Sequence, residues 1–283
     1  MSDMLIDALA LNAALASQDP PLLFDCRFEL SDPGSGRQAY AAGHLPGAHY
    51  LHLDEDLSAA KHDAAGRFRG RHPLPTREVF AARLAARGWR PGRAVVAYDA
   101  SGGMYAARLW WMLRWLGEGQ VALLDGGLGA WTGAGLALRT EPPVATPLAA
   151  PDALPEPAMP TLEAADLLAR LGQWPLVDAR GPERYRGEVE PLDTQAGHIP
   201  GAVNRPFAMN LQADGRFKPK EQLRAEWQAL IGAAPVVVHQ CGSGVTACHN
   251  LFTQALAGLG LGTLYPGSWS EWSSDPSRPL ATG

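Results

Sequence analysis

A cysteine and the short loop after it are the residues of this sequence that are best suited to chemistry. The loop reads CGSGVTA over residues 241–247. It follows a short apolar run, residues 236–239, and precedes a helix-like stretch, residues 245–256, so we expect it to join a buried strand to a helix. A thiolate at a helix N-terminus is stabilised by backbone N–H groups and by the positive end of the helix dipole. Cys241 is therefore predicted to be a nucleophile.

The residues around the cysteine favour a cradle for an anion. Gly242 and Gly244 have no Cβ atom, so the backbone can curl round the sulfur and point its N–H groups inward. We expect the loop, including Val245 and Thr246, to hold a persulfide anion on Cys241 as well as the thiolate. The alternative is that Cys241 is simply a small buried residue, as most cysteines are.

The sequence repeats itself, which indicates two related domains. GHLPGA at residues 43–48 returns as GHIPGA at residues 197–202. LLFDCR at residues 22–27 likewise corresponds to PLVDAR at residues 175–180. Two long copies in the same motif order predict a pair of domains rather than a solenoid.

A proline-rich stretch between the copies marks the linker, because proline forbids regular helix and favours extended backbone. We predict a first domain over residues 1–140, a linker over residues 141–160 and a second domain over residues 161–283. Aligning the copies places Ala100 opposite Cys241. The first domain is therefore expected to be inactive and the second to be catalytic.

Short apolar runs alternate with helix-like stretches in both halves. This alternation predicts an α/β fold of two tandem domains, each a parallel sheet with helices on both faces. In such sheets ligands bind at the carboxyl ends of the strands, where loops lead into helices. The cysteine loop occupies such a place.

Composition restricts the classes of partner. Hydrophobic residues make up 46% of the 283 residues and charged residues 19%, which is typical of a globular protein. The net charge of -5 disfavours binding to nucleic acid or to an acidic membrane surface. No long apolar run or basic leader is present, and three cysteines do not suggest a disulfide framework, so we expect a cytoplasmic protein with a small-molecule partner.

Taken together, these motifs resemble the tandem-domain rhodanese family. The resemblance covers nearly the whole chain, through the two GHxPGA copies, WWM at residues 110–112, GSWSEW at residues 267–272 and above all the CGSGVTA loop. It implies two rhodanese-like domains and a ping-pong reaction. In that reaction the Cys241 thiolate attacks the donor sulfur, and the persulfide then passes the sulfur to cyanide, a thiol or a reduced protein. No cofactor or metal is implied.

The loop type bears on the sulfur donor. CGSGVTA is similar to the loop of 3-mercaptopyruvate sulfurtransferases, whereas thiosulfate sulfurtransferases tend to have CRKGVTA. Thiosulfate is a compact dianion that benefits from cations on the loop, and this loop has Gly242 and Ser243 instead. We therefore expect 3-mercaptopyruvate, which leaves as the enolate of pyruvate, with thiosulfate as the alternative donor.

The resemblance also implies roles for residues outside the cysteine. Arg184, in DARGPERYRG, falls on the arginine that binds the anionic end of the donor, and a guanidinium can hold a carboxylate through two bonds. Ser243 falls on a serine near the leaving group, and the histidine of the first domain, His44, and the acid Asp32 are the candidates for its partners. The alternatives are that Ser243 merely turns the loop, and that His44, which has a twin in His198, is a hydrogen-bonded scaffold residue. Many relatives have a second arginine where this chain has Leu192, and Arg186 is the candidate to replace it.

Two other readings come from different classes of protein. Related phosphatases need Cys-x5-Arg to grip a phosphoryl group, and the residue six after Cys241 is Ala247, which disfavours phosphate chemistry. A sulfur-relay module that accepts persulfide only from a partner protein shares the fold and stays open. Pyruvate release from the donor without any partner would separate that module from an enzyme.

Overall fold

The computed structural model describes residues 4–283, and these residues form two compact units. Unit 1 holds the residues up to Ser58, together with Pro75–Ala158 and Gln212–Phe217. Unit 2 holds Ala59–Leu74, Met159–Leu211 and Lys218–Gly283. Each unit is built around one parallel sheet, which confirms the predicted α/β class.

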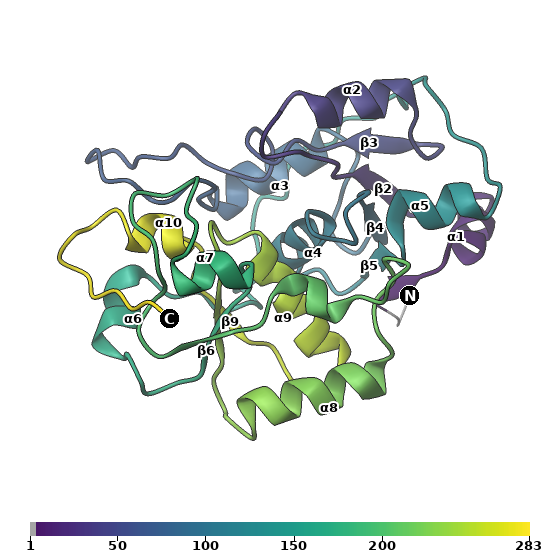
Figure 1. The fold of residues 1–283 in the computed structure, drawn as a ribbon. Coiled ribbons are helices and arrows are strands. Elements are labelled where there is room, and N and C mark those ends of the chain that lie inside the picture. Colours follow the sequence, from purple (N-terminus) through teal and green to yellow (C-terminus); the bar gives the residue numbers. More distant parts are fainter. Residues whose placement is uncertain (1–3) are drawn as a thin grey trace. The chain divides into compact units, whose positions relative to one another are not determined.

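Unit 1 contains a five-stranded parallel sheet in the order β1-β5-β4-β2-β3. The strands are β1 (Leu5–Ile6), β2 (Leu22–Asp25), β3 (Ala48–Tyr50), β4 (Val95–Tyr98) and β5 (Val121–Leu124). Figure 1 shows helices on both sides of it: α1 (Ala8–Leu15) and α5 (Gly127–Gly133) on one, α3 (Arg77–Ala85) and α4 (Ala106–Trp115) on the other, with α2 (Ser35–Ala42) beyond β3. The inner strands are buried along their whole length because both faces are covered.

Unit 2 repeats this plan with a four-stranded parallel sheet in the order β7-β6-β8-β9. Its strands are β6 (Leu176–Asp178), β7 (Ala202–Asn204), β8 (Val238–Gln240) and β9 (Thr263–Leu264). Its helices are α6 (Ala164–Ala169), α7 (Pro182–Arg186), the 3-10 helix η1 (Phe207–Asn210), α8 (Lys220–Ile231), α9 (Thr246–Leu256) and α10 (Ser268–Trp272). The order β7-β6-β8-β9 matches β3-β2-β4-β5, as a duplication requires.

The repeated sequence motifs hold matching places in the two sheets. Arg27 pairs with Asp25 at the end of β2, and its Nη2 also donates to the carbonyl oxygen of Gly43 at 2.7 Å. Arg180 does the same with Asp178, and with the carbonyl oxygen of Gly197 at 2.8 Å. Because both glycines begin GHxPGA, each buried ion pair ties that motif to its neighbouring strand, and the duplicated residues serve the scaffold.

The units differ from the predicted domains in two segments. Each segment comes from one half of the sequence but groups with the unit formed mainly by the other half, and we call these the exchanged segments. Residues 59–74 belong to unit 2 although their neighbours on both sides belong to unit 1, and residues 212–217 belong to unit 1. The backbone N–H of Arg71 donates to Ser270 Oγ at 2.7 Å, and that of Phe217 donates to Asp125 Oδ1 at 2.9 Å. Both exchanged segments contain Gly-Arg-Phe, at residues 66–68 and 215–217.

The predicted linker has no helix or strand anywhere along residues 141–160, all of which are described. Most of it groups with unit 1, which extends to Ala158. One hydrogen bond that attaches it runs from the N–H of Leu148 to the carbonyl oxygen of Ala85, at 2.9 Å. The proline-rich segment thus lies as irregular chain on unit 1.

A buried histidine in the core of unit 2 gives a test of the fold by pH. Burial lowers the pKa of His239 on β8 to about 4, against a modest rise from its contact with Gln254 and a small lowering by Arg205. Between pH 6.5 and about pH 4 the unfolded chain therefore binds a proton that the folded chain does not, so stability falls as the pH falls through this window.

We expect the free energy of unfolding to drop by about 2 kcal/mol between pH 6.5 and about pH 5 from His239 alone. Urea unfolding of the wild type and of His239→Gln at both pH values measures it. Because glutamine does not titrate, the free energy of unfolding should fall by about 2 kcal/mol less in the variant than in the wild type over this pH range. Equal losses in the two proteins would contradict the assignment.

Candidate active site

The cysteine loop has the expected strand-loop-helix setting. Cys241 directly follows β8, and α9 begins at Thr246. The Cys241 side chain is a free thiol and the residue is only 2% exposed. Gly244 has φ +76°, and a Cβ atom there would lie 2.5 Å from the carbonyl oxygen of Pro266, so glycine is required at this position.

The start of α10 anchors the loop from the other side. The N–H of Cys241 donates to Ser268 Oγ at 3.2 Å, and the carbonyl oxygens of Cys241 and Gly242 accept from the N–H groups of Trp269 and Ser270, both at 2.9 Å. Ser268 has φ +53°, the one positive φ among the non-glycine residues described. The GSWSEW motif therefore serves to fix the loop.

Several N–H groups of the loop have no acceptor in the described part of the protein. Within residues 4–283, the backbone N–H groups of Gly242, Ser243 and Val245 have no hydrogen-bond partner in the protein. The three residues are nevertheless buried. Buried donors of this kind are normally paired, so the loop is prepared to receive an acceptor such as an anion.

The loop of unit 1 that corresponds to the cysteine loop follows β4 and begins at Asp99. Asp25 pairs with Tyr98 and Asp178 pairs with Gln240, so the register places Asp99 opposite Cys241. The prediction that Ala100 occupies this position is wrong by one residue. It aligns the copies through DGG at residues 125–127 and PGS at residues 266–268, and the segment from Asp99 to Asp125 is one residue longer than the segment from Cys241 to Pro266.

The Asp99 carboxylate accepts hydrogen bonds from the backbone N–H groups of Ser101, Gly103, Tyr105 and Ala106, at 2.8–2.9 Å. The loop of the first copy therefore already contains an anion, bound by the same kind of donor. This geometry is consistent with a first domain that takes no ligand at this loop.

A histidine that the sequence analysis missed lies beside the cysteine loop. His72 comes from the exchanged segment, residues 59–74, and its Nδ1 lies 2.7 Å from Ser243 Oγ. His72 is 4% exposed and Ser243 is 6% exposed. A hydroxyl hydrogen-bonded to an imidazole is an arrangement that can donate, accept or pass on a proton.

His44, which the resemblance suggested for this role, belongs to unit 1. Its Nδ1 lies 2.8 Å from the carbonyl oxygen of Tyr40, its Nε2 lies 3.1 Å from that of Glu141, and its ring stacks on Tyr40 at 3.9 Å. The twin His198 repeats the stacking on Tyr185 at 3.9 Å and the Nδ1 contact at 2.8 Å. Both environments are those of scaffold histidines.

Two arginines reach the loop, and one of them was not foreseen. A Cβ atom at Gly242 would lie 3.2 Å from Nη1 of Arg184 and 2.7 Å from Nη2 of Arg71. Arg184, on α7, thus lies beside the cysteine loop, and its role in binding the donor stays a prediction. The Arg186 side chain, the candidate for the second arginine, is 40% exposed and pairs with Glu188 at 2.7 Å.

Carboxylates balance these cations. Arg184 Nη2 contacts Glu190 at 2.7 Å and Asp193 at 3.0 Å, and Asp193 also pairs with Arg71. The connected network holds three arginines, Arg71, Arg180 and Arg184, and three carboxylates, Asp178, Glu190 and Asp193. The site therefore has little formal excess of positive charge. Leu192, between these acids, is 42% exposed.

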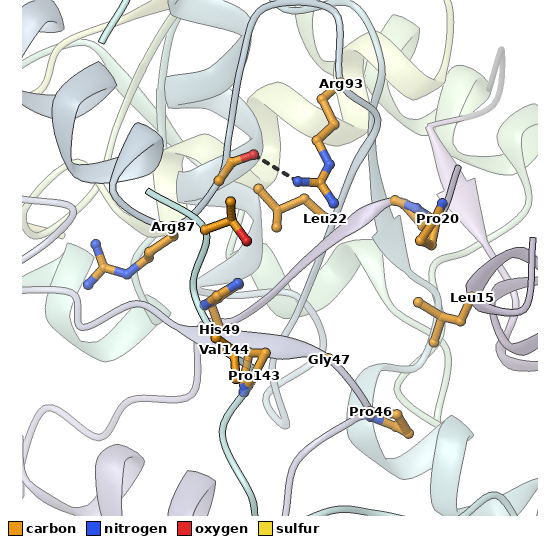
Figure 2. Close-up of a pocket in the computed structure, with 13 residues that line it drawn as sticks. Leu15, Pro20, Leu22, Pro46, Gly47, His49, Arg87, Arg93, Pro143 and Val144 are labelled. Carbon is orange, nitrogen blue, oxygen red and sulfur yellow. Dashed lines mark hydrogen bonds between the residues drawn. The ribbon is translucent and has the colours of Figure 1, made fainter. Parts of the chain in front are cut away.

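A pocket in unit 1 has a different chemistry. Figure 2 shows Leu15, Pro20 and Pro46 on one side of it and Arg87, His49 and Val144 on the other; Leu22 and Arg93 also line it, and its volume is about 320 Å³. Burial, followed by the charges of Arg87 and Arg93, lowers the pKa of His49 in its wall. No cysteine or carboxylate is among its lining residues, all of which are described. The pocket has no group for covalent sulfur chemistry.

The described residues offer no group of three or more His, Cys, Asp or Glu side chains that could hold a metal ion. Among the helices of residues 4–283, none is long and apolar enough to cross a membrane.

Comparisons with known proteins agree with the duplicated fold. The family model described as the rhodanese-like domain matches residues 7–134 and again residues 163–275. A solved structure, the 3-mercaptopyruvate sulfurtransferase from Leishmania major, superposes with a TM-score of 0.82 at 30% identity, covering 96% of this chain and 75% of that one.

Two curated relatives cover almost the whole chain and carry different donor names. A Pseudomonas aeruginosa protein named "Probable 3-mercaptopyruvate sulfurtransferase" is 50% identical, with 100% of this chain and 99% of that protein matched. A Mycobacterium tuberculosis protein named "Putative thiosulfate sulfurtransferase SseB" is 42% identical, with 99% of this chain and 97% of that protein matched.

Proposed function

The chain belongs to the rhodanese family of sulfurtransferases, and from this premise we propose that it takes sulfane sulfur from 3-mercaptopyruvate and carries it as a persulfide on Cys241. The acceptor is cyanide, a thiol or a reduced protein. The observation that carries the proposal is the 2.7 Å contact between His72 Nδ1 and Ser243 Oγ, two residues along the loop from the cysteine. No cofactor takes part.

The first half-reaction transfers sulfur from the donor to Cys241 and needs only the donor, Cys241, Ser243 and His72. The Cys241 thiolate attacks the thiol sulfur of the donor, the carbon–sulfur bond breaks, and pyruvate leaves as its enolate. The proton of the donor thiol then moves to the enolate carbon, which leaves pyruvate and an anionic persulfide on the enzyme. Ser243 donates its hydroxyl hydrogen to the ketone oxygen, where negative charge develops, and His72 supports that hydroxyl.

The persulfide anion then lies in the cradle of the cysteine loop. The N–H groups of Gly242, Ser243 and Val245 are the available donors, and the N-terminus of α9 adds its positive dipole end. The Asp99 carboxylate in unit 1, with four N–H donors, supports the idea that a loop of this design stabilises one negative charge. Stabilising the persulfide favours its accumulation between the two half-reactions.

The charge balance favours a monoanionic donor over thiosulfate. Arg71 and Arg184 lie beside the loop, but Glu190 and Asp193 neutralise them. A compact dianion would need additional cations, whereas a single carboxylate can take the place of one acid in the network. The Ser243 hydroxyl then faces a ketone rather than a sulfonate oxygen.

The test measures both donors in parallel on the purified protein, with cyanide as the acceptor and no partner protein. We expect kcat/KM for 3-mercaptopyruvate to exceed that for thiosulfate by about tenfold or more, which corresponds to about 1.4 kcal/mol. Pyruvate release equal to thiocyanate formation would support the cycle. A higher rate with thiosulfate would reverse the donor assignment, and no turnover with either would favour the partner-dependent relay module.

The proposal includes a cytoplasmic location for the protein. Cys26, Cys241 and Cys248 are all free thiols in the structure. Free cysteines are typical of a reducing compartment, and the cycle needs Cys241 as a thiolate at its start. We therefore assign the protein to the cytoplasm, where thiol acceptors are abundant.

A further inference from the structure

The pocket of unit 1 lies at the edge of the sheet where the parallel strands begin (Figure 2). Leu22, the first residue of β2, lines it, and so does Arg93, two residues before β4. The loop of Asp99 leaves β4 at the opposite, carboxyl edge, where ligand sites of parallel sheets ordinarily lie. The pocket is therefore separate from the position in unit 1 that corresponds to the cysteine loop.

The walls of this pocket combine an apolar surface with a few polar groups. Its polar side chains are those of His49, Arg87, Arg93 and Thr146. The apolar side chains are those of leucine, proline and valine, namely Leu15, Pro20, Pro21, Leu22, Pro46, Pro143 and Val144. Its volume of about 320 Å³ is within the range of small-molecule sites, and such a lining suits a ligand with an apolar body and a charged end.

The Arg93 guanidinium has an edge that is suited to a carboxylate. Its Nη1 donates to the carbonyl oxygen of Gly88 at 2.7 Å, whereas its Nε and Nη2 have no hydrogen-bond or ion-pair partner in the described chain. The equivalent edge of Arg27 shows what it can bind, because Nε and Nη2 of Arg27 donate to the Asp25 carboxylate at 2.9 Å and 2.6 Å. Arg93 therefore offers two parallel donors to an acid that the protein does not itself supply.

The neighbouring arginine is already neutralised, so the pocket has one spare positive charge. Arg87 donates from Nη2 to Asp56 Oδ1 at 2.8 Å and from Nη1 to the carbonyl oxygen of Arg83 at 2.9 Å. The ring nitrogens of His49 make no hydrogen bond within the described chain, and its lowered pKa keeps the ring neutral near pH 7, with one N–H to donate. One cation and one neutral donor match a ligand with a single negative charge.

The corresponding place in unit 2 is filled. There too the end of the first helix and the Pro-Gly of GHxPGA contribute lining residues, but the cavity is only about 10 Å³. Trp174 lines it and takes the place of Pro21, because each lies four residues before the aspartate of the D-x-R motif. The Arg170 guanidinium lies 4.9 Å from the Trp174 ring. The duplicated fold is therefore stable with this pocket closed.

The polar groups of the pocket are also peculiar to unit 1. His49 pairs with the strand of Asp25 at the position where Val203 pairs with the strand of Asp178, so valine replaces the imidazole in unit 2. The same register places Pro235 opposite Arg93. The scaffold therefore requires neither side chain, and a ligand gives them a role that the fold does not.

We propose that this pocket of unit 1 binds a small amphipathic monocarboxylate, whose carboxylate takes the Nε–Nη2 edge of Arg93 and whose apolar body lies against the leucines and prolines. The volume corresponds to about ten water molecules at about 30 Å³ each, so we expect an acid of about ten non-hydrogen atoms. The site is independent of the sulfur-transfer proposal, because all of its residues belong to unit 1 and the cysteine loop belongs to unit 2.

Calorimetry with 3-phenylpropionate and two matched ligands tests the chemical class. 3-Phenylpropanamide has the same body without the charge, and acetate has the charge without the body. We expect both to have dissociation constants at least about tenfold higher than that of 3-phenylpropionate, because each lacks one of the two contacts. Equal binding of the acid and the amide, or no binding of the acid at about 10 mM, would overturn the inference.

Arg93→Gln tests the proposed carboxylate contact. It should raise the dissociation constant of 3-phenylpropionate by about 10- to 100-fold, because it removes a pair of charge-assisted hydrogen bonds. Arg90→Gln is the matched control: Arg90 is exposed in the same turn, loses the same charge, and should leave the constant within about twofold. An equal rise in both variants would show a general effect of charge and would contradict the contact with Arg93.

Two further variants locate the bound acid. Pro21→Trp, which copies Trp174 of unit 2, should abolish binding by filling the pocket, with thermal unfolding as the check that the variant is folded. Arg184→Ala removes a cation beside the cysteine loop and should leave the dissociation constant unchanged. Retained binding in folded Pro21→Trp, or binding lost in Arg184→Ala and kept in Arg93→Gln, would refute this site. If Pro21→Trp does not fold, the comparison of Arg93→Gln with Arg90→Gln decides.

Discussion

Cys241→Ser should abolish sulfur transfer and leave no donor-derived sulfur on the protein. A serine hydroxyl is a poor nucleophile toward sulfur at neutral pH, and the oxygen cannot form a persulfide. Mass spectrometry after incubation with 3-mercaptopyruvate should show one added sulfur on the wild-type peptide that contains Cys241, and none on the variant. Cys241 is almost fully buried, and serine has nearly the same size and shape as cysteine, so the variant should keep the fold.

Cys26→Ala is the matched control for the loss of a thiol. Burial, with smaller contributions from the carboxylates of Asp25, Asp99 and Asp56, raises the pKa of Cys26 well above its ordinary value. That thiol therefore stays protonated and unreactive. Cys26→Ala should retain turnover and the added sulfur on Cys241. Turnover by Cys241→Ser, or loss of the persulfide in Cys26→Ala, would refute the assignment of the carrier.

His72→Ala should lower kcat by about 10²- to 10⁴-fold, the usual range for a lost proton-transferring group. Its ring lies 2.7 Å from Ser243 Oγ, so its removal leaves the hydroxyl without its support. Ser243→Ala should have a similar effect, and the double variant should be no worse than the worse single variant, because the two act as a unit.

Two other histidines provide controls for that experiment. His62 lies in the same segment, residues 59–74, but it is exposed and its ring contacts that of Phe68. His62→Ala should therefore keep wild-type kcat. His44→Gln should lower stability while the folded fraction keeps its kcat, since His44 contacts backbone carbonyls of unit 1. A loss of kcat in folded His44→Gln as large as in His72→Ala would restore His44 to the catalytic role.

The parts of the fold that follow from local pattern could be predicted from the sequence. Buried strands read as short apolar runs, and the repeated GHxPGA and D-x-R motifs locate equivalent points in the two sheets. The cysteine loop is readable because strand, glycines and helix are contiguous. The membership of residues 59–74 in unit 2 could not be predicted in this way, because it depends on contacts between segments far apart in the sequence.

His72 and Arg71 were missed for that reason. His72 and Ser243 are 171 positions apart, and neither belongs to a motif that appears twice. One signal was present in the sequence: Gly-Arg-Phe at residues 66–68 and 215–217 aligns the two segments. After it the first copy continues through residues 69–76 before α3, whereas the second has only residues 218–219 before α8. The extra residues contain Arg71 and His72.

Because residues 59–74 belong to unit 2, the proposed active centre contains residues from both copies of the duplication, although the first copy has Asp99 where the second has Cys241. A fragment that begins at Met159 would contain Cys241, Ser243 and Arg184, but it would lack Arg71 and His72. After such a gene doubled, the copy whose loop contains Asp99 could not be deleted without removing part of the other copy's machinery. With Arg71 and His72 in their proposed places, selection on one active centre would maintain both halves of the sequence through residues 59–74.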